Sequence, residues 1–481
     1  MNLNILAIDQ GTSSTKALVV TEAGDVIGEA EVSVHPKVVG DGGVEQDPEE
    51  LLQSIIQAGR AALAAASVSV AAVGIANQGE TVVAWDAANG KAASSAISWQ
   101  DRRSSVVTDR MPESASRLQE ITGLPLDPYF TAPKLKWLTD RTPGPVRVTG
   151  IDAWINFRLT GRAITDSSTA SRSLLLDLDT RRWSSEAATL FDIDLETLPD
   201  VVDCAGSFGE TSVFGPTLPV TGLAVDQQAA LIGESCMEVG EGKCTYGTGA
   251  FLLVTTGREP CRSRNGLSAS VAWQYGSEHA YCLDGQVYTA GSAVEWLRKM
   301  GLVNGAADLD GLVVSAARDS KVVCVPSLAG LGAPYWQPQA KAHLEGMTLD
   351  TGPAEIVLSV LKGIACQVAV LVRSAESDLG QKLVSLRVDG GLTRSSVLMQ
   401  LQADLLQMPV ELFPSPHATV LGVASLARHG ADASSSISQG LPKSGRCFEP
   451  LISGDEAAEL LTRWEEAAAR VLAASGVGHS A

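Results

Sequence analysis

Several features that define large protein classes are missing from this sequence. No GxxxxGKS/T motif occurs, which excludes a P-loop enzyme, and no good GxGxxG follows a predicted strand, which argues against a dinucleotide dehydrogenase. The 8 cysteines form no CxxC pair, and none of the 6 histidines stands at metal-ligand spacing. We therefore expect most of the cysteines to be reduced and buried, where they pack as small apolar side chains.

Basic charge is also scarce. Lys and Arg number 36 against 55 Asp and Glu, which gives a formal net charge of −19 at pH 7. A protein of this charge repels polyanions, so we expect neither nucleic acid nor an anionic membrane as its partner. A phosphate ligand must then be held by local backbone amides and a metal ion.

Long apolar runs and targeting signals are absent as well. We find no unbroken apolar run near membrane-spanning length, and the chain begins almost at once with a strand instead of a signal peptide. These absences predict a cytoplasmic protein.

At 481 residues and 45% apolar content, the chain suits two large globular domains. The short Gly- and Glu-rich stretch at 238–242 is the expected hinge, so we predict domains over 1–237 and 238–481.

The opening stretch ILAIDQGTSSTKALVV, residues 5–20, predicts a strand, a tight hydroxyl-rich turn and a second strand. The amides and hydroxyls of such a turn suit a polyphosphate, and Asp9 is placed to hold Mg²⁺ through water. CTYGTGAFLLVTT, residues 244–256, partly repeats the pattern. An ordinary polar-tipped hairpin would explain either stretch alone. Together they favour a duplicated α/β fold with a nucleotide between two lobes.

Acidic residues follow the predicted strands of the first half. A helix over 48–66, capped by Asp47, precedes a strand over 70–76 that ends at Glu80, and a strand over 220–225 ends at Asp226. This order indicates an α/β sheet with its ligand site beyond the strand ends. Each acid alone is as readily a helix cap. Taken with Asp9 and the two loops, they favour phosphoryl transfer, which needs a carboxylate to take a hydroxyl proton.

The second half offers a further nucleotide element. Residues 386–391 predict a strand running into a glycine pair, and a helix follows over 395–406. Such a junction suits the base, ribose and phosphate of a nucleotide, although a plain strand-to-helix turn remains an alternative.

Ordered blocks along nearly the whole chain resemble the FGGY carbohydrate kinases, and within them the glycerol kinase branch. The blocks are IDQGTSSTKALVV, VEQDPEE, GIANQGETVVAWD, ISWQDRR, TGLPLDPYFTAPKLKWL, LTG, VDQQAAL, TYGTGAFLL, GLGAPYW and VDGGLTRSSVLMQLQADLL. The resemblance implies two actin-like, ribonuclease H-like domains that close on ATP and a polyhydroxyl substrate. It also implies a homodimer or homotetramer, without deciding between them.

The resemblance also implies roles for individual residues. Asp226 matches the general base and Asp9 the metal-linked acid. The positions that match substrate contacts are Gly79, Glu80, Trp99, Tyr129, Asp226, Gln227 and Phe251. The positions that match ATP contacts are Thr12, Ser13, Ser14, Lys16, Thr248, Gly291, Glu295, Gly391 and Ser395.

The sequence departs from the glycerol kinase pattern at several of these positions. Gly79 stands where an arginine is usual, which removes a cation and several donors from the substrate loop. Lys16, Glu295, Ser395 and His417 also replace the usual residues. Glycerol is the default substrate, and a four- or five-carbon polyol or ketose such as xylulose or ribulose is the close alternative. A non-catalytic actin-like ATPase is the alternative of a different class.

Overall fold

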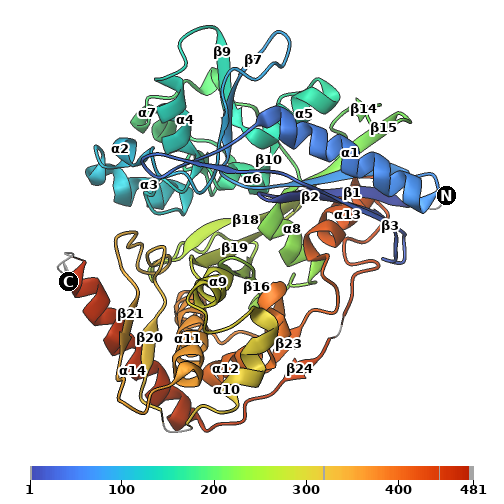
Figure 1. Cartoon of the computed structure of the whole chain (residues 1–481). Coiled ribbons are helices and arrows are strands. Elements are labelled where there is room, and N and C mark those ends of the chain that lie inside the picture. Colours follow the sequence, from blue (N-terminus) through green and yellow to red (C-terminus); the bar gives the residue numbers. More distant parts are fainter. Residues whose placement is uncertain (1–2, 318–319, 444, 476–481) are drawn as a thin grey trace.

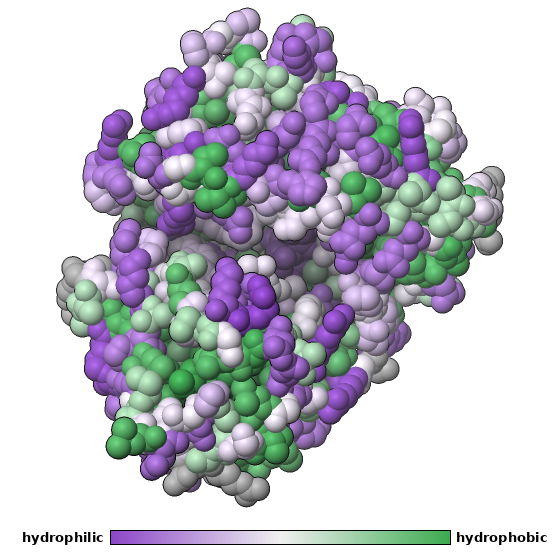
Figure 2. Space-filling view, in the orientation of Figure 1, coloured by the Kyte–Doolittle hydropathy of each residue, from purple (hydrophilic) through white to green (hydrophobic). Residues whose placement is uncertain are grey.

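The computed structural model describes residues 3–317, 320–443 and 445–475 in two lobes that face each other (Figure 1). The upper lobe in this view contains the blue and green first half of the chain, and the lower lobe contains most of the yellow and red second half. The space-filling view shows the surface hollowed between them (Figure 2).

The upper lobe is built on a 6-stranded sheet with the strand order β14-β15-β6-β1-β2-β3. Its strands are β1 (Ile5–Gln10), β2 (Ser14–Val20), β3 (Val26–Ser33), β6 (Ala72–Asn77), β14 (Glu210–Thr211) and β15 (Leu218–Val225). The first three strands pair antiparallel, whereas β6 and β15 run parallel to β1. The carboxyl ends of β1, β6 and β15 therefore meet at one edge.

Two groups of helices cover the two faces of this sheet. Helix α1 (Pro48–Ala66) packs on β1 to β3, and the Asp47 carboxylate caps it by accepting a hydrogen bond from the amide of Glu49. The opposite face is covered by α8 (Asp226–Gly233) and by α13 (Ala418–Ala431), which returns from the far end of the chain. The second half of the chain thus completes the core of the first lobe.

Helices α8 and α13 touch backbone to backbone. A Cβ atom added at Gly233 would lie 1.9 Å from the carbonyl oxygen of Ala418, and one added at Gly422 would lie 1.8 Å from that of Ala229. Only glycine fits at these two positions without moving the helices apart.

Smaller elements complete the upper lobe above the sheet (Figure 1). A 5-stranded sheet, ordered β4-β5-β8-β7-β9, comprises β4 (Lys37–Val39), β5 (Gly43–Gln46), β7 (Val82–Asp86), β8 (Ala96–Ile97) and β9 (Val146–Gly150). The remaining short strands are β10 (Ile164–Asp166), β11 (Leu176–Asp177), β12 (Arg182–Trp183) and β13 (Asp200–Val202). The helices are α2 (Ser105–Thr108), α3 (Ala115–Thr122), α4 (Thr131–Thr139), α5 (Ile151–Thr160), α6 (Ser167–Ser171) and α7 (Ser185–Leu190).

The lower lobe repeats the strand arrangement of the upper one. Its 7-stranded sheet is ordered β18-β19-β17-β16-β22-β23-β24. The strands are β16 (Glu241–Tyr246), β17 (Ala250–Gly257), β18 (Ser268–Tyr275), β19 (Glu278–Val287), β22 (Ser385–Asp389), β23 (Val410–Leu412) and β24 (Cys447–Phe448). Strand β17 is antiparallel to β16 and β19 to β17, while β22 and β23 run parallel to β16, as β6 and β15 do to β1. The predicted duplicated α/β fold is confirmed.

Helices pack around this second sheet. They are α9 (Gly291–Lys299), α10 (Leu309–Val313), α11 (Pro353–Leu379), α12 (Ser396–Leu406) and α14 (Gly454–Ala474), with the strand pair β20 (Val323–Val325) and β21 (His343–Glu345) at the side. Among the described helices, α11 is long and apolar enough to cross a membrane by length and composition, although Lys362 interrupts its apolar run. Since 78% of its apolar window is buried inside the protein, α11 serves as a core helix.

Candidate active site

The first predicted phosphate loop is a tight turn between β1 and β2, and side chains from other segments hold it in place. The amide of Gly11 donates to the carbonyl oxygen of Ser14 at 3.0 Å. The Thr12 hydroxyl donates to the side-chain carbonyl of Gln78 at 3.1 Å, and the side-chain amide of Gln46 donates to the Thr12 carbonyl at 2.9 Å. Gln78 also donates to Gln46 at 2.9 Å. The loop is therefore fixed before any ligand binds.

Two acids stand at the strand ends beside this loop. Asp9 lies on β1 opposite Lys16 on β2, and Asp226 begins helix α8 directly after β15. Burial and the neighbouring Asp226 raise the pKa of Asp9 to about 7, although Lys16 partly opposes this. Burial and then Glu80 raise the pKa of Asp226 to about 6. Acids held this close in a site of low polarity favour proton transfer or a cation between them.

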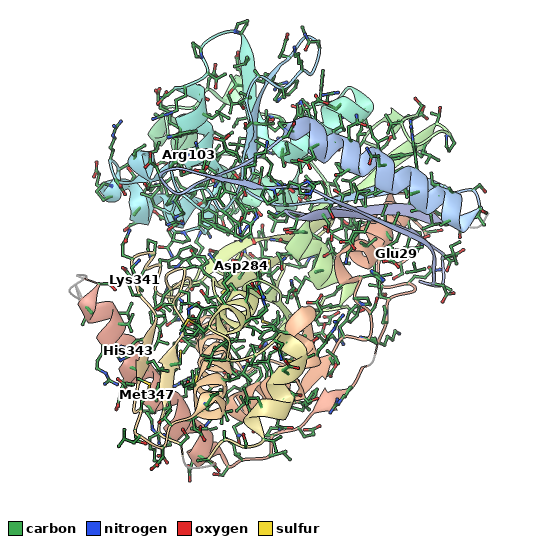
Figure 3. All side chains as sticks on the ribbon, viewed as in Figure 1. Glu29, Arg103, Asp284, Lys341, His343 and Met347 are labelled. Carbon is green, nitrogen blue, oxygen red and sulfur yellow. The ribbon has the colours of Figure 1, made fainter. Side chains whose placement is uncertain are left out.

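A cavity at the lobe boundary collects most of the predicted substrate residues. It encloses about 350 Å³ including the part open to solvent. The predicted substrate contacts that line this cavity are Glu80, Tyr129, Asp226, Gln227 and Phe251. Arg172, Asp284 and Gln286, which the sequence did not single out, line it as well. The carboxylate of Asp284 comes from β19 of the lower lobe and lies at the boundary with the upper lobe (Figure 3).

A buried ion triad joins the two lobes inside this cavity. The Arg172 guanidinium donates to Glu80 at 2.6 Å from Nε and to Asp284 from Nη1. Burial alone would lower the pKa of Arg172, but Asp284 and Glu80 more than offset it, so the group stays charged. Glu80 has a φ of 54°, in the left-handed region that few non-glycine residues adopt. The backbone at this predicted substrate residue is therefore strained, and the ion pair holds its carboxylate.

Tyr129 is positioned by charged groups beneath its loop. Lys134, which is fully buried, donates to the carbonyl oxygens of Pro128, Tyr129 and Phe130. Its burial lowers its pKa to about 7. Asp127 accepts a hydrogen bond of 2.8 Å from the Tyr129 amide. The loop thus presents the Tyr129 ring to the cavity from a rigid base.

Trp99 connects the cavity to the phosphate loop, whereas Gly79 stands apart. The Trp99 ring packs edge-on against Tyr129 at 5.7 Å and Phe251 at 6.3 Å between centroids, and its indole N–H donates to the Thr12 hydroxyl at 2.9 Å. Neither Trp99 nor Gly79 lines the cavity itself. A Cβ atom there would have one near neighbour, Val225 Cγ2 at 3.0 Å.

Gln227, which follows Asp226, is held from the lower lobe. Its amide N–H donates to the Asp226 carboxylate at 2.7 Å, and its side-chain carbonyl accepts a hydrogen bond of 2.5 Å from Lys243 on β16. The buried Lys243 also donates to Thr245 at 2.9 Å. A lysine of the second sheet therefore reaches the residue beside the predicted base.

The second predicted phosphate loop is closed by the start of α9. The amides of Ala290 and Ser292 each donate to the Thr248 carbonyl at 3.0 Å, and the amide of Gly291 donates to that of Gly247 at 3.0 Å. A Cβ atom at Gly291 would lie 2.5 Å from the Gly247 oxygen, so glycine is required there. The structure thus brings together the predicted ATP contacts Thr248 and Gly291.

The remaining predicted ATP contacts make other interactions. Ser395 caps α12 and donates to Asp310, and Glu295 pairs with Arg298 on the exposed side of α9. Gly391 is exposed beside Gly390. Ser13 is exposed in the first loop, and Ser14 begins β2.

Comparison with known proteins identifies the family and the fold. Residues 4–233 match the N-terminal domain of the FGGY family of carbohydrate kinases, and residues 242–431 match its C-terminal domain. The glycerol kinase of Aromatoleum aromaticum is 39% identical over 97% of this chain and 98% of that protein. The glycerol kinase of Dechloromonas aromatica is 40% identical over 97% of each. The chain belongs to the FGGY family of carbohydrate kinases.

Solved structures agree with this family assignment. The structure of Plasmodium falciparum glycerol kinase with ADP has a TM-score of 0.91, 32% identity and coverage of 98% of both chains. A xylulose kinase from Lactobacillus acidophilus has a TM-score of 0.89 over 98% of this chain at 21% identity, which supports the fold alone. The predicted pair of actin-like, ribonuclease H-like domains is confirmed, and this FGGY kinase uses ATP as its phosphate donor.

Sequence reasoning missed several polar residues of the kinase site. They are Gln46, Gln78, Arg172, Lys243, Asp284 and Gln286. Gln46 and Gln78 lie inside the blocks that carry the family resemblance, so those blocks already contained a signal for them. Asp284 and Gln286 alternate with apolar residues and a glycine in the strand segment LDGQV, a pattern that does not indicate what either side chain faces.

Proposed function

We propose that this kinase transfers the terminal phosphoryl group of Mg-ATP to a terminal hydroxyl of a small neutral polyol or sugar, with glycerol as the default substrate. The observation that carries the proposal is the position of Asp226, which lines the cavity while standing near Asp9 at the phosphate loop. The curated relatives at 39% and 40% identity are glycerol kinases, which supports the default. We assign residues 1–237 to the first domain and 238–481 to the second.

In this proposal Asp226 is the general base. Its pKa of about 6 keeps it mostly ionised at neutral pH while leaving it basic enough to take the hydroxyl proton as the phosphoryl group transfers. Glu80, Tyr129 and Gln227 hold the other hydroxyls, and Trp99 and Phe251 form the apolar wall behind the carbons. Closure of the lobes excludes water, which limits ATP hydrolysis.

The phosphates of ATP lie between the two loops in this proposal. Thr12, Ser13 and Ser14 bind them from the upper lobe with Lys16 beside them. Thr248, Gly291, Glu295, Gly391 and Ser395 contact the nucleotide from the lower lobe. The support is the matching geometry of the loops, each closed by backbone hydrogen bonds at 3.0 Å.

The donor set fits a magnesium ion bound mainly through phosphate oxygens and water. Among the residues that the structure describes, no group of three His, Cys, Asp or Glu side chains is placed to hold a metal by itself. Mg²⁺ typically takes one or two carboxylates together with substrate phosphates. Asp9, whose pKa burial and Asp226 raise to about 7, would hold the ion through water. The ion would neutralise charge on the transferred group.

The charges of the cavity favour a neutral substrate. Three carboxyl groups, those of Glu80, Asp226 and Asp284, line it with the single guanidinium of Arg172. The resulting negative potential disfavours a sugar acid or a sugar phosphate. Without the usual arginine at Gly79, a four- or five-carbon polyol or a ketose such as xylulose or ribulose is the second candidate substrate.

The proposal is tested by coupled ADP release with Mg-ATP over glycerol, tetritols, pentitols, pentuloses and dihydroxyacetone. We expect saturable turnover with at least one of these neutral compounds and none with gluconate. Turnover of gluconate alone would contradict the charge argument. ATP binding without turnover of any compound would favour the non-catalytic actin-like ATPase.

We also propose a cytoplasmic location and a homodimer or homotetramer. All 8 cysteines are unpaired and six of them are buried, which is typical of a protein in a reducing compartment. The measurement for the assembly is light scattering of the purified protein with and without Mg-ATP.

A further inference from the structure

We propose that Gln286 is a specificity-determining residue whose side-chain amide binds a substrate oxygen beyond the three hydroxyls of glycerol. The inference rests on the proposed function, because it requires a polyol or ketose in the cavity. It predicts that a neutral compound with at least four oxygens makes a contact in the cavity that glycerol does not make.

The position of Gln286 places it at the substrate. It lies on β19 directly opposite Phe251 on β17, and both residues line the cavity with Asp226. The side chain is 1% exposed. Neither its amide nitrogen nor its amide oxygen has a hydrogen-bond partner among the residues that the structure describes. Burying an unpaired donor and an unpaired acceptor is costly, so a partner from outside the chain is expected.

The neighbouring glutamines of the cavity differ in this respect. The side chain of Gln227 accepts from Lys243, and that of Gln228 donates to Ser270 at 3.1 Å. Arg172 is likewise engaged by Glu80 and Asp284. Among the residues that the structure describes, Gln286 therefore has only the nearby Tyr288 hydroxyl as a polar neighbour, and no hydrogen bond of good geometry forms between them.

The chemistry of the amide indicates what it binds. An amide both donates and accepts, which matches a hydroxyl, and its donor alone matches a ketose carbonyl. It carries no charge, so it adds no affinity for an anion to a cavity already rich in carboxylates. An arginine at position 79 would instead supply donors and a positive charge. A fourth oxygen on a four- or five-carbon neutral substrate is the ligand that fits.

A structural partnership with Tyr288 is the competing account. The Tyr288 hydroxyl lies close to the Gln286 amide and to Arg102. If that contact were the role of Gln286, then Tyr288→Phe would reproduce the effect of removing the amide. The Tyr288→Phe variant therefore distinguishes the two accounts.

The test compares Q286M with wild type by coupled ADP release on glycerol and on a panel of tetritols, pentitols and pentuloses. Methionine keeps the length and removes the hydrogen bonds. We expect kcat/KM for the best larger substrate to fall about tenfold to a hundredfold, mainly through KM, because the loss of a directed hydrogen bond is costly. We expect a change below about threefold for glycerol and for the KM of ATP, since these do not use the amide.

The matched control is Q402M. Gln402 is also a buried glutamine of the lower lobe, with an unpaired side-chain nitrogen, but it lies on α12 and does not line the cavity. The Q402M variant should have a changed melting temperature but the wild-type ratio of kcat/KM values between substrates. A uniform loss on all substrates in Q286M, or the same selective loss in Y288F, would overturn the inference and leave the proposed kinase function intact. A wild-type protein inactive on every compound would overturn the proposed function itself.

Discussion

The indole nitrogen of Trp99 donates a hydrogen bond of 2.9 Å to the hydroxyl of Thr12. Trp99 packs against Tyr129 and Phe251, which line the cavity, while Thr12 belongs to the first phosphate loop. One side chain therefore spans the substrate wall and the phosphate loop. In the proposed mechanism, this contact keeps the bound polyol and the phosphates aligned with each other.

Trp99→Phe should separate the two roles of this residue. Phenylalanine keeps an aromatic wall but loses the hydrogen bond to Thr12, whose net worth is about 1 kcal/mol, so kcat should fall about threefold to tenfold. The KM of the polyol should change less than about twofold because the wall remains. Trp99→Ala should raise that KM as well. The measurement is steady-state kinetics of both variants with the polyol and with Mg-ATP as the varied substrate. Equal kinetic constants in the two variants would contradict the division of roles.

The acid limb of the pH profile should report Asp226. Burial and Glu80 raise its pKa to about 6, and the base acts only when it is ionised. The kcat/KM for the polyol should therefore fall about tenfold per pH unit below about pH 6 and reach a plateau above it. Initial rates from pH 4.5 to pH 8.5 at saturating Mg-ATP measure this. A rate that stays level down to pH 4.5 would be inconsistent with a base of raised pKa.

Lys134→Met should disturb the loop that carries Tyr129. The buried ammonium donates to three backbone carbonyls, and removing it leaves them unsatisfied at a cost of about 1 to 3 kcal/mol each at most. We expect a lower melting temperature and a higher KM for the polyol. Lys136→Met on the same helix is the control, since Lys136 forms surface pairs with Asp140 and Asp192 that are worth little. Calorimetry gives the melting temperatures of both variants, and steady-state kinetics gives their KM values for the polyol. Equal changes in the two variants would contradict the role of Lys134 in holding this loop.

Gly79→Arg should shift substrate preference toward glycerol. Gly79 is buried, and a Cβ atom added there would meet Val225 Cγ2 at 3.0 Å as its only neighbour within 4 Å among the described residues, so the first carbon of a side chain fits after a small adjustment of that valine. The restored donors should raise kcat/KM for glycerol relative to a pentitol by about tenfold, the value of one directed hydrogen bond to a charged group. Gly79→Met supplies bulk without donors and is the control. The same shift in both variants would mean that volume, and not hydrogen bonding, sets the preference.

Local patterns in the sequence predicted much of the fold. The helix over 48–66 agrees with α1 at both ends because Asp47 and a proline mark its start and an apolar face runs along it. The strands of the two loops were predictable from β-branched runs interrupted by glycine and hydroxyl residues. These signals act within a few residues and need no knowledge of the rest of the chain.

Long-range packing was not predictable in the same way. Helix α13 completes the core of the first lobe although it follows β1 by about 400 residues. No local sequence pattern at Gly422 predicts that it packs against Gly233. The triad formed by Arg172 with Asp284 likewise joins side chains that only the folded lobes bring together. Asp9 and Asp226 were predicted from their places at strand ends as well as from the family blocks, and Tyr129 was predicted from the family blocks alone. No prediction was made for Gln286, because strand alternation does not reveal which face of a strand binds a ligand.

The most direct test of this account is the turnover of Asp226→Asn beside its affinity for Mg-ATP. Asparagine keeps the size of the side chain and cannot take the hydroxyl proton. We predict that kcat for the best polyol falls by about 10²-fold to 10⁴-fold, the usual worth of a positioned base, while the Kd of Mg-ATP from calorimetry stays within about threefold. A variant that keeps wild-type turnover would contradict the assignment of Asp226 as the base on which the proposed mechanism depends.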